Sequence, residues 1–242
     1  MGSIEIFAQQ KRILGQVRRA IEDYNMIEEG DKIAVGVSGK DSLTLLIALR
    51  QLQNFFSKKF SLEAITLTLG MGECDLSYTK KLCEELGINY TIIETQIGKI
   101  VFEVRKEENP CSLCANLRRG ALHNAAKELG CNKVALGHHR DDVIETFMLS
   151  TLYEGRIHTF SPVTFLDEKE LYVIRPLVYA EEKEIKGFIK ANGIIPIENS
   201  CKANGETKRQ DIKELINTLG KSNKHIKANI FGAIKRAGID GW

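Results

Sequence analysis

Short apolar runs alternate with amphipathic segments along most of the chain. Runs rich in β-branched residues predict strands, and apolar residues spaced three or four positions apart predict helices. After an amphipathic helix over residues 4–24, the pattern predicts strands at 32–37, 60–69, 90–94 and 133–136, and helices at 41–55, 76–86, 117–129 and 141–152. Strands that alternate with helices in this way form a mostly parallel sheet with helices on both faces.

The remaining pattern adds a hairpin and a helical tail. Residues 163–166 and 172–174 predict a β-hairpin, residues 181–191 predict a helix, and two more helices follow the polar loop 199–206. We therefore expect an N-terminal helix over residues 1–25, a Rossmann-like α/β domain over 26–195 and a helical C-terminal segment over 196–242. Ligands of such sheets bind beyond the carboxyl ends of the strands, where the helices begin.

The composition is that of an ordinary soluble globular protein, with 43% hydrophobic residues, 27% charged residues and a net charge of +2. No apolar run approaches the roughly 20 residues of a membrane span, and the N-terminus has no signal-peptide pattern. We therefore expect a cytoplasmic protein without a membrane partner. Because thiols stay reduced in that compartment, the six cysteines predict metal binding, catalysis or core packing before disulfides.

Basic residues gather towards both ends of the chain. From Cys201 onward there are nine Lys and Arg against four Asp and Glu, and Lys11, Arg12, Arg18 and Arg19 lie on the first predicted helix. This distribution fits either solvated helix faces or a surface that binds a polyanion, and the sequence favours neither.

The first predicted strand of the sheet runs directly into a helix through Ser38, Gly39, Lys40, Asp41 and Ser42. A helix start offers free backbone N–H groups and a partial positive charge, both of which suit a phosphate group. Gly39 lets the backbone come close to a ligand, the serine hydroxyls can donate to its oxygens, and Lys40 adds positive charge. A capped strand–helix turn explains single polar residues here but not their density. The loop therefore predicts a phosphate-binding site.

A second polar cluster follows the strand predicted at 133–136. Gly137, His138 and His139 precede Arg140, Asp141 and Asp142 at the start of the next helix. Aspartates are common helix caps, so Asp141 and Asp142 alone would indicate no function. Their position beside two histidines and an arginine at a ligand-binding edge predicts a site. A carboxylate there can hold the Mg²⁺ that offsets phosphate charge.

Three of the cysteines point to metal chemistry. Cys111 and Cys114 form a CxxC pair, which by itself fits a redox pair or half of a zinc site. Zinc favours a fourth ligand, and the sequence has no second CxxC or close Cys/His pair. Three thiolates, with Cys201 as the third, suit an iron–sulfur cluster with one iron left open. Of the others, Cys83 and Cys131 are expected in the core, and Cys74 is a candidate sulfur relay.

These segments together resemble a known family. Residues 38–42 resemble the Ser-Gly-Gly-x-Asp-Ser loop of the PP-loop ATP pyrophosphatases, with one glycine fewer, and residues 137–142 resemble the Gly-His-His/Asn-x-Asp-Asp motif of tRNA-modifying members. With the CxxC pair, the Leu117-Arg118-Arg119-Gly120 run that follows it, and Cys201, the chain is similar to the tRNA 2-thiocytidine synthetases over residues 32–219.

The resemblance implies an enzyme that uses ATP, Mg²⁺ and a 4Fe–4S cluster to thiolate tRNA. It would adenylylate the C2 oxygen of a pyrimidine, an anticodon-loop cytidine in that family, and replace this oxygen with sulfur, releasing AMP and pyrophosphate. Residues 26–195 would bind ATP, and residues 196–242 would carry the third cluster cysteine. The implied partners are tRNA, a sulfur donor (a cysteine desulfurase or free sulfide) and a second copy of the chain as a homodimer.

Each matched position then receives an expected role. The residues expected to act in catalysis are Lys40, Asp141 and Asp142, and those expected to bind the nucleotide are Ser38, Gly39, Lys40, Asp41, Ser42, Gly137 and His138. The cluster would be held by Cys111, Cys114 and Cys201, and its open iron would bind the incoming sulfide. The residues expected to contact tRNA are Arg118, Arg119 and Arg140.

Three other interpretations stay open. A cluster-free adenylylating ligase of the tRNA lysidine synthetase type would have no need of the three cysteines. A 2-thiouridine synthetase has comparable machinery but normally carries extra zinc-binding cysteine pairs, which this sequence lacks. A nucleotide- or tRNA-binding regulator without catalysis is favoured by the shortened 38–42 loop, and measurable AMP release would exclude it.

Overall fold

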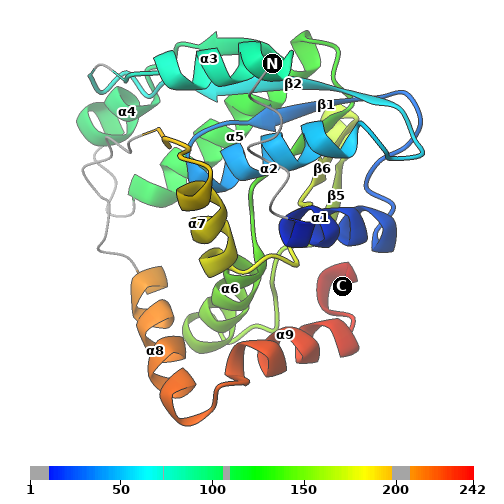
Figure 1. Cartoon of the computed structure of the whole chain (residues 1–242). Coiled ribbons are helices and arrows are strands. Elements are labelled where there is room, and N and C mark those ends of the chain that lie inside the picture. Colours follow the sequence, from blue (N-terminus) through cyan, green and yellow to red (C-terminus); the bar gives the residue numbers. More distant parts are fainter. Residues whose placement is uncertain (1–10, 73, 106–109, 198–207) are drawn as a thin grey trace.

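Six strands form one sheet in the order β3-β2-β1-β4-β6-β5 in the computed structural model, which describes residues 11–72, 74–105, 110–197 and 208–242 (Figure 1). The strands are β1 (Asp31–Gly36), β2 (Phe60–Leu67), β3 (Asn89–Ile93), β4 (Lys133–Ala135), β5 (Val163–Leu166) and β6 (Leu171–Ile174). Neighbouring strands from β3 to β6 run parallel, while β5 pairs antiparallel with β6. This arrangement confirms the predicted mostly parallel sheet and the predicted hairpin.

Helices cover both faces of the sheet. The helical segments are α1 (Lys11–Asp23), α2 (Lys40–Leu52), α3 (Ser77–Leu86), α4 (Ile97–Lys99), the π-helical η2 (Ile100–Arg105), α5 (Pro110–Glu128), α6 (Arg140–Tyr153), the 3-10 turn η3 (Asp167–Lys169), α7 (Glu182–Ala191), α8 (Lys208–Ser222), α9 (Ile226–Arg236) and the 3-10 turn η4 (Ile239–Gly241). Ile33 and Val35 of β1 share one core with α1, α2, α3 and α7, whereas Ala34 shares another with α5. Alternate residues of a strand face opposite sides, so β1 is buried on both.

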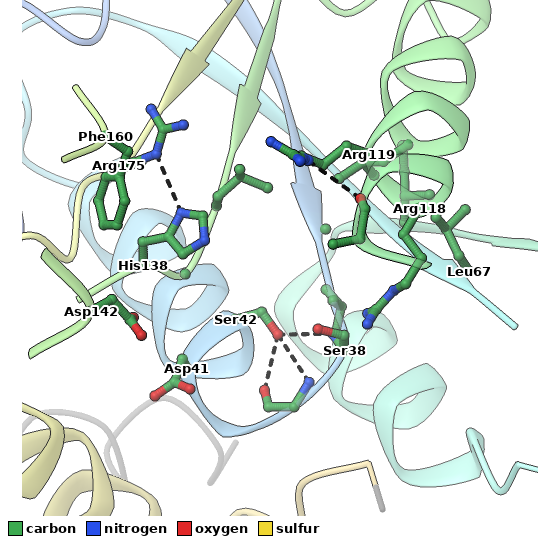
Figure 2. A pocket seen from close by; sticks show the side chains of 18 of the residues that line it. Ser38, Asp41, Ser42, Leu67, Arg118, Arg119, His138, Asp142, Phe160 and Arg175 are labelled. Atoms are coloured by element: carbon green, nitrogen blue, oxygen red, sulfur yellow. Dashed lines mark hydrogen bonds between the residues drawn. The ribbon is translucent and has the colours of Figure 1, made fainter. Parts of the chain in front are cut away.

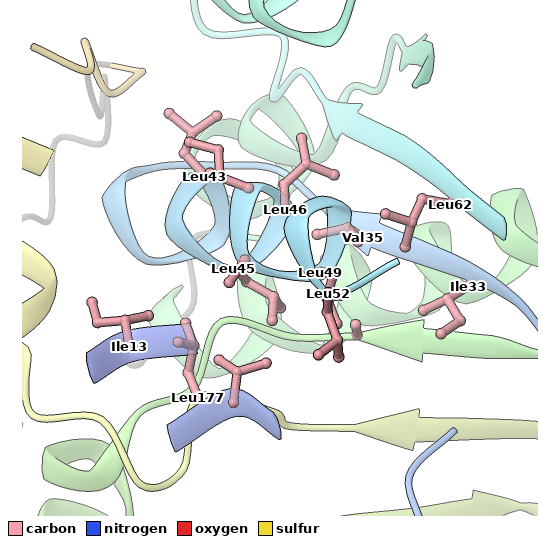
Figure 3. Packing of buried hydrophobic residues seen from close by; sticks show 14 of the residues in the cluster. Ile13, Ile33, Val35, Leu43, Leu45, Leu46, Leu49, Leu52, Leu62 and Leu177 are labelled. Carbon is pink, nitrogen blue, oxygen red and sulfur yellow. The ribbon is translucent and has the colours of Figure 1, made fainter. Parts of the chain in front are cut away.

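Helix α2 forms the centre of the larger core. Its Leu45, Leu46, Leu49 and Leu52 are fully buried. Figure 3 shows Leu45, Leu49 and Leu52 on the side of α2 that faces α1, and Leu46 on the opposite side. Each buried leucine stabilises the fold by about 2 kcal/mol relative to an exposed one. The N-terminus of α2, directly after β1, is therefore held on a rigid support.

Helix α5 departs from the prediction, because it begins at Pro110 and not at residue 117. Proline is favoured at the first helical position, where its missing N–H would have no intrahelical partner. The earlier start places Cys111 and Cys114 on the first two turns of a helix instead of in a loop. The other described elements match their predicted ranges to within a few residues, while residues 4–10 of the first predicted helix lie outside the described part of the chain.

The two predicted C-terminal helices are confirmed as α8 and α9, and they pack on α6. Ile212 and Ile216 of α8 share a small core with Ile144 of α6. Lys213 of α8 donates to Glu182 of α7 (2.7 Å), and Lys227 of α9 donates to Asp141 of α6 (2.6 Å). In the part of the chain that the structure describes, no helix combines the length and apolarity needed to cross a membrane.

At the amino-terminal ends of β1 and β4, Asp31 and Lys133 form a buried ion pair. Lys133 Nζ lies 2.7 Å from Asp31 Oδ2 and donates to the Met26 carbonyl, and both side chains are less than a tenth exposed. We expect Lys133→Met to lower the free energy of unfolding by about 3 kcal/mol, because the Asp31 carboxylate would stay buried without its cation.

Urea denaturation of this variant measures the loss. Lys127→Met is the matched control, because the Lys127–Glu170 pair is exposed and 4.0 Å long and is expected to contribute less than about 1 kcal/mol. Equal midpoints for Lys133→Met and the unchanged protein would contradict the prediction.

Candidate active site

The loops after β1 and β4 touch each other at the carboxyl edge of the sheet. A Cβ atom at Gly137 would stand 2.9 Å from the Ser42 backbone nitrogen and 3.0 Å from the Asp41 carbonyl carbon. Both atoms belong to the backbone and cannot move aside alone. Glycine at 137 therefore lets the β4–α6 loop lie directly against the start of α2.

A cavity of about 680 Å³ opens where these loops meet (Figure 2). This volume is in the range of sites that enclose a nucleotide-sized ligand. Of the predicted site residues, those that line it are Ser38, Gly39, Asp41, Ser42, Gly137, His138, Asp142, Arg118 and Arg119. The two motifs and the start of α5, far apart in sequence, therefore share one cavity.

The β1–α2 loop presents backbone groups to this cavity. Ser42 Oγ accepts hydrogen bonds from the backbone nitrogens of Ser38 (2.9 Å) and Gly39 (3.1 Å), which fixes the loop over the first turn of α2. A Cβ at Gly39 would meet no atom within 4 Å, so this position faces open space. The start of a buried helix beside open space is a site that favours an anion.

Lys40 is turned away from the lining of the cavity. Its ammonium nitrogen lies 2.8 Å from Asp41 Oδ2 and 3.5 Å from Glu182 Oε1 of α7. The cation thus joins the start of α2 to α7. Its catalytic role stays a prediction.

His139 caps α6 by a reciprocal pair of hydrogen bonds. Its backbone nitrogen donates to Asp142 Oδ2 (2.9 Å), and its Nδ1 accepts from the Asp142 backbone nitrogen (3.3 Å). This arrangement leaves Asp142 Oδ1 to bind the guanidinium of Arg209 on α8, at 3.0 Å. Asp142 therefore lines the cavity with one oxygen held by the cap and the other by an arginine.

Asp141, by contrast, is buried behind the cavity. Its Oδ1 accepts from Lys227 Nζ and its Oδ2 from the Glu182 backbone nitrogen (2.8 Å). Burial alone raises the pKa of Asp141, but these two hydrogen bonds outweigh it and hold the pKa below its usual value. The predicted catalytic pair is thus divided, with Asp142 at the cavity and Asp141 anchoring α6 to α7 and α9.

Arg140 also points away from the cavity lining. It is hydrogen-bonded to Glu181, and its guanidinium carbon lies 5.9 Å from the ring centre of Phe231 on α9. Its predicted contact with tRNA would therefore take place on another surface.

Carboxylates at the cavity provide oxygen ligands of the kind that Mg²⁺ prefers. Asp41 and Asp142 both line the cavity and lie near each other in Figure 2. Behind them, burial and then the neighbouring Asp142 raise the pKa of Glu145 to about 7. The described residues contain no group of three or more His, Cys, Asp or Glu side chains placed to hold a metal ion. A magnesium ion here would therefore be shared with the phosphates of its nucleotide.

The lining residues that were not predicted from the sequence include Phe160, Arg175 and Arg209. Arg175 directly follows β6, so the rule that strand ends carry ligand-binding residues applies to it as well. Arg209 reaches the cavity from α8, and nothing in its local sequence distinguishes it from the other basic residues of the tail.

The predicted cluster cysteines lie at the start of α5. Cys111 is exposed, and Cys114 is buried in a small core with Ile97 and Val101. The next turns of the same helix carry Arg118 and Arg119, which line the cavity. Two thiols spaced by one helical turn beside the cavity fit two ligands of a metal centre. Cys201, the third predicted ligand, lies outside the described residues.

The remaining cysteines differ in their surroundings. Cys83 and Cys131 are buried, as predicted, and burial raises the pKa of each thiol to about 11. Neither forms a reactive thiolate at neutral pH. Cys74 is exposed and does not line the cavity, so its role as a sulfur relay stays a prediction.

Comparisons with known proteins identify the family of this chain. A family described as the PP-loop domain matches residues 10–219. The tRNA-cytidine(32) 2-sulfurtransferase of Syntrophotalea carbinolica is 37% identical over 95% of this chain and 89% of its own length, and that of Alcanivorax borkumensis is 40% identical over 93% and 81%.

A solved structure shares the fold. The U34-tRNA thiolase NcsA from Methanococcus maripaludis, determined with its 4Fe-4S cluster, superposes with a TM-score of 0.77 over 96% of this chain and 80% of that chain. The two sequences are 24% identical, so the likeness concerns the arrangement of the sheet and its helices.

Proposed function

Since this chain belongs to the PP-loop domain family, we propose that it is an ATP-dependent tRNA sulfurtransferase that converts an anticodon-loop cytidine to 2-thiocytidine. The observation that carries the proposal is the junction of the two loops. The phosphate-binding start of α2 and the acidic start of α6 line the same cavity, which also receives arginines from the helix that bears the CxxC pair.

The α2 start receives the phosphates of ATP in this proposal. Backbone groups around Gly39 bind the phosphates. Asp41 and Asp142 would hold Mg²⁺, which would offset the charge of the phosphates. Arg209, which pairs with Asp142 and lines the cavity, can also neutralise phosphate charge.

The chemistry then proceeds in two displacements. The C2 oxygen of the cytidine attacks the α phosphorus, and the bond to the leaving pyrophosphate breaks. Sulfide (HS⁻) next attacks C2, the C–O bond breaks to release AMP, and loss of the S–H proton leaves the 2-thio group. Arg118 and Arg119 hold the tRNA backbone or the nucleotide at the cavity, and exclusion of water prevents hydrolysis from restoring the base.

Cys111 and Cys114 would hold two corners of a 4Fe–4S cluster, with Cys201 as the third ligand. Their place on the first two turns of α5 fits this role, because a helix start favours thiolates over thiols. When bound, such a cluster supplies an iron that is not ligated by the protein and can carry the incoming sulfur.

Lys40 and Asp141 contribute by position in this scheme. Lys40 bridges Asp41 and Glu182, and Asp141 bridges Lys227 and the backbone of Glu182. Both loops are thus braced against α7, which keeps the phosphate side and the metal side of the cavity at a fixed separation.

The partners follow from the chemistry. We propose that a cysteine desulfurase or free sulfide donates the sulfur, that the enzyme acts as a homodimer and that it acts in the cytoplasm. Light scattering of the purified protein measures the oligomeric state, and assays with each sulfur source alone separate the two donors.

The activity is tested on protein purified without oxygen. Iron, acid-labile sulfide and zinc are measured, and an unmodified tRNA transcript is incubated with ATP, Mg²⁺ and sulfide. We expect roughly four irons per chain and the appearance of 2-thiocytidine by mass spectrometry, together with one AMP for each thiolated base. AMP release without thiolation and without iron would instead support a cluster-free ligase.

A further inference from the structure

Arg175 and His138 meet at the carboxyl ends of two adjacent strands. Arg175 directly follows β6, and His138 lies in the loop after β4, its parallel neighbour in the sheet. Arg175 Nε donates to His138 Nδ1 at 3.3 Å, and Figure 2 shows this bond at the side of the cavity. Both residues line the cavity.

The arginine is itself held in one orientation. Its other guanidinium nitrogen donates to the Ser161 carbonyl (2.7 Å) and to Thr164 Oγ1 (3.1 Å). The ring of Phe160 stacks on both partners, with its centre 4.8 Å from that of His138 and 5.1 Å from the Arg175 guanidinium carbon. The imidazole therefore cannot rotate without breaking a bond and a ring contact.

This contact decides where the proton of His138 lies. Arginine has N–H donors and no acceptor, so the Nδ1 atom that receives its hydrogen bond must carry a lone pair. In a neutral imidazole the proton is then on Nε2. Burial, and then the charge of Arg175, lower the pKa of His138 to about 4, which keeps the ring neutral at physiological pH.

The protonated nitrogen faces the cavity. In Figure 2 the ring nitrogen that is not bonded to Arg175 is directed towards the cavity, on the side of Ser42. Within the described part of the chain it has no hydrogen-bond partner. A neutral N–H group that is fixed in direction and lacks an acceptor is suited to an oxygen of a bound nucleotide.

We propose that Arg175 is a positioning residue, which holds His138 as the Nε2–H tautomer so that this N–H donates to an oxygen of bound ATP. A neutral imidazole N–H is a much weaker acid than an imidazolium, so it stabilises charge that develops on this oxygen without transferring its proton to it. The kinetic part rests on the proposed ATP-dependent function, whereas the tautomer is a property of the protein alone.

The tautomer is measured on the full chain by two-dimensional NMR that correlates the ring protons of histidine with both ring nitrogens. The His138 signals are assigned by their loss in His138→Gln. We expect Nδ1 of the unchanged protein to have the shift of an unprotonated nitrogen and Nε2 that of a protonated one. The reverse assignment, or an average of the two, would overturn the proposal, and this result needs no variant of Arg175.

Variants then test the role of Arg175. In Arg175→Gln we expect the His138 signals to move to averaged positions and the rate of AMP formation to fall about 10- to 100-fold, as for other partners that orient functional histidines. Arg175→Lys keeps a cationic donor and is expected to restore part of the tautomer signature and part of the rate. Arg119→Gln is a control for the tautomer alone, because it removes a guanidinium from the same cavity and is expected to leave the His138 signals unchanged.

The outcomes separate the two proposals. An averaged tautomer in Arg175→Gln with an unchanged rate of AMP formation would refute the positioning role, as would an unchanged tautomer with a lowered rate. Absence of AMP formation in the unchanged protein, with the Nε2–H tautomer present, would refute the proposed function and leave the assignment of the proton standing.

Discussion

Replacing Cys111 by alanine is expected to remove most of the iron from the protein and to reduce tRNA thiolation to background, while ATP binding is retained. The side chain is exposed, so its loss should change the free energy of unfolding by less than about 0.5 kcal/mol. A centre held by three thiolates, however, cannot keep its protein ligation when one is missing. Iron content, thiolation of a tRNA transcript and nucleotide titration measure the three quantities separately.

Cysteine variants elsewhere in the chain provide the comparison. Cys114→Ala and Cys201→Ala should lose iron and thiolation in the same way as Cys111→Ala. Cys74→Ala, another exposed position, should keep its iron. If it keeps iron but loses thiolation, Cys74 relays sulfur. Full iron content in Cys111→Ala would show that the cluster is held elsewhere.

Gly39→Ala is expected to lower the rate of ATP-dependent AMP formation by roughly 100- to 1,000-fold without changing the melting temperature. The backbone at Gly39 is extended (φ 170°), so alanine can adopt it, and its Cβ would meet no protein atom within 4 Å. The methyl group would instead occupy space at the start of α2 that the proposed mechanism reserves for phosphate. Steady-state kinetics with varied ATP and thermal denaturation measure the two effects.

Gly137→Ala is the contrasting variant. Its methyl group would press on the backbone of Ser42 and Asp41, so we expect a loss of about 1–3 kcal/mol in the free energy of unfolding. Near-normal kinetics of Gly39→Ala would mean that the phosphates bind away from this loop. A lowered melting temperature in that variant would mean that Gly39 serves the fold.

The sequence predicts the framework well because its apolar pattern is strong. The run from Ile33 to Val37 and the leucines of α2 admit few other arrangements, and both motifs follow strands whose carboxyl ends must share an edge. The start of α5 was missed because residues 110–116 show little apolar periodicity. The proline at position 110 was the available signal.

Side-chain directions were harder to predict. Asp141 and Asp142 are equivalent in a motif, but a cap formed with His139 directs Asp142 to the cavity, while Lys227 from α9 holds Asp141 away from it. Lys227, which fixes the direction of the Asp141 side chain, lies 86 positions further along the chain. Arg175 and Arg209 were missed for the same reason, since each acquires its place through neighbours that are remote in sequence.

The ion pairs between the tail and the motifs limit how this enzyme can be recombined with its relatives. Each of three basic residues of the tail, Arg209, Lys213 and Lys227, forms an ion pair with a carboxylate on α6 or α7. The last two helices therefore cannot be exchanged freely between relatives. In a chimera that takes its tail from a relative, a carboxylate on α6 or α7 would be left unpaired wherever the relative's tail lacks the matching cation. Substitutions in the tail and in the motif are therefore expected to be accepted as pairs, and a search for a shorter functional enzyme should trim the chain elsewhere.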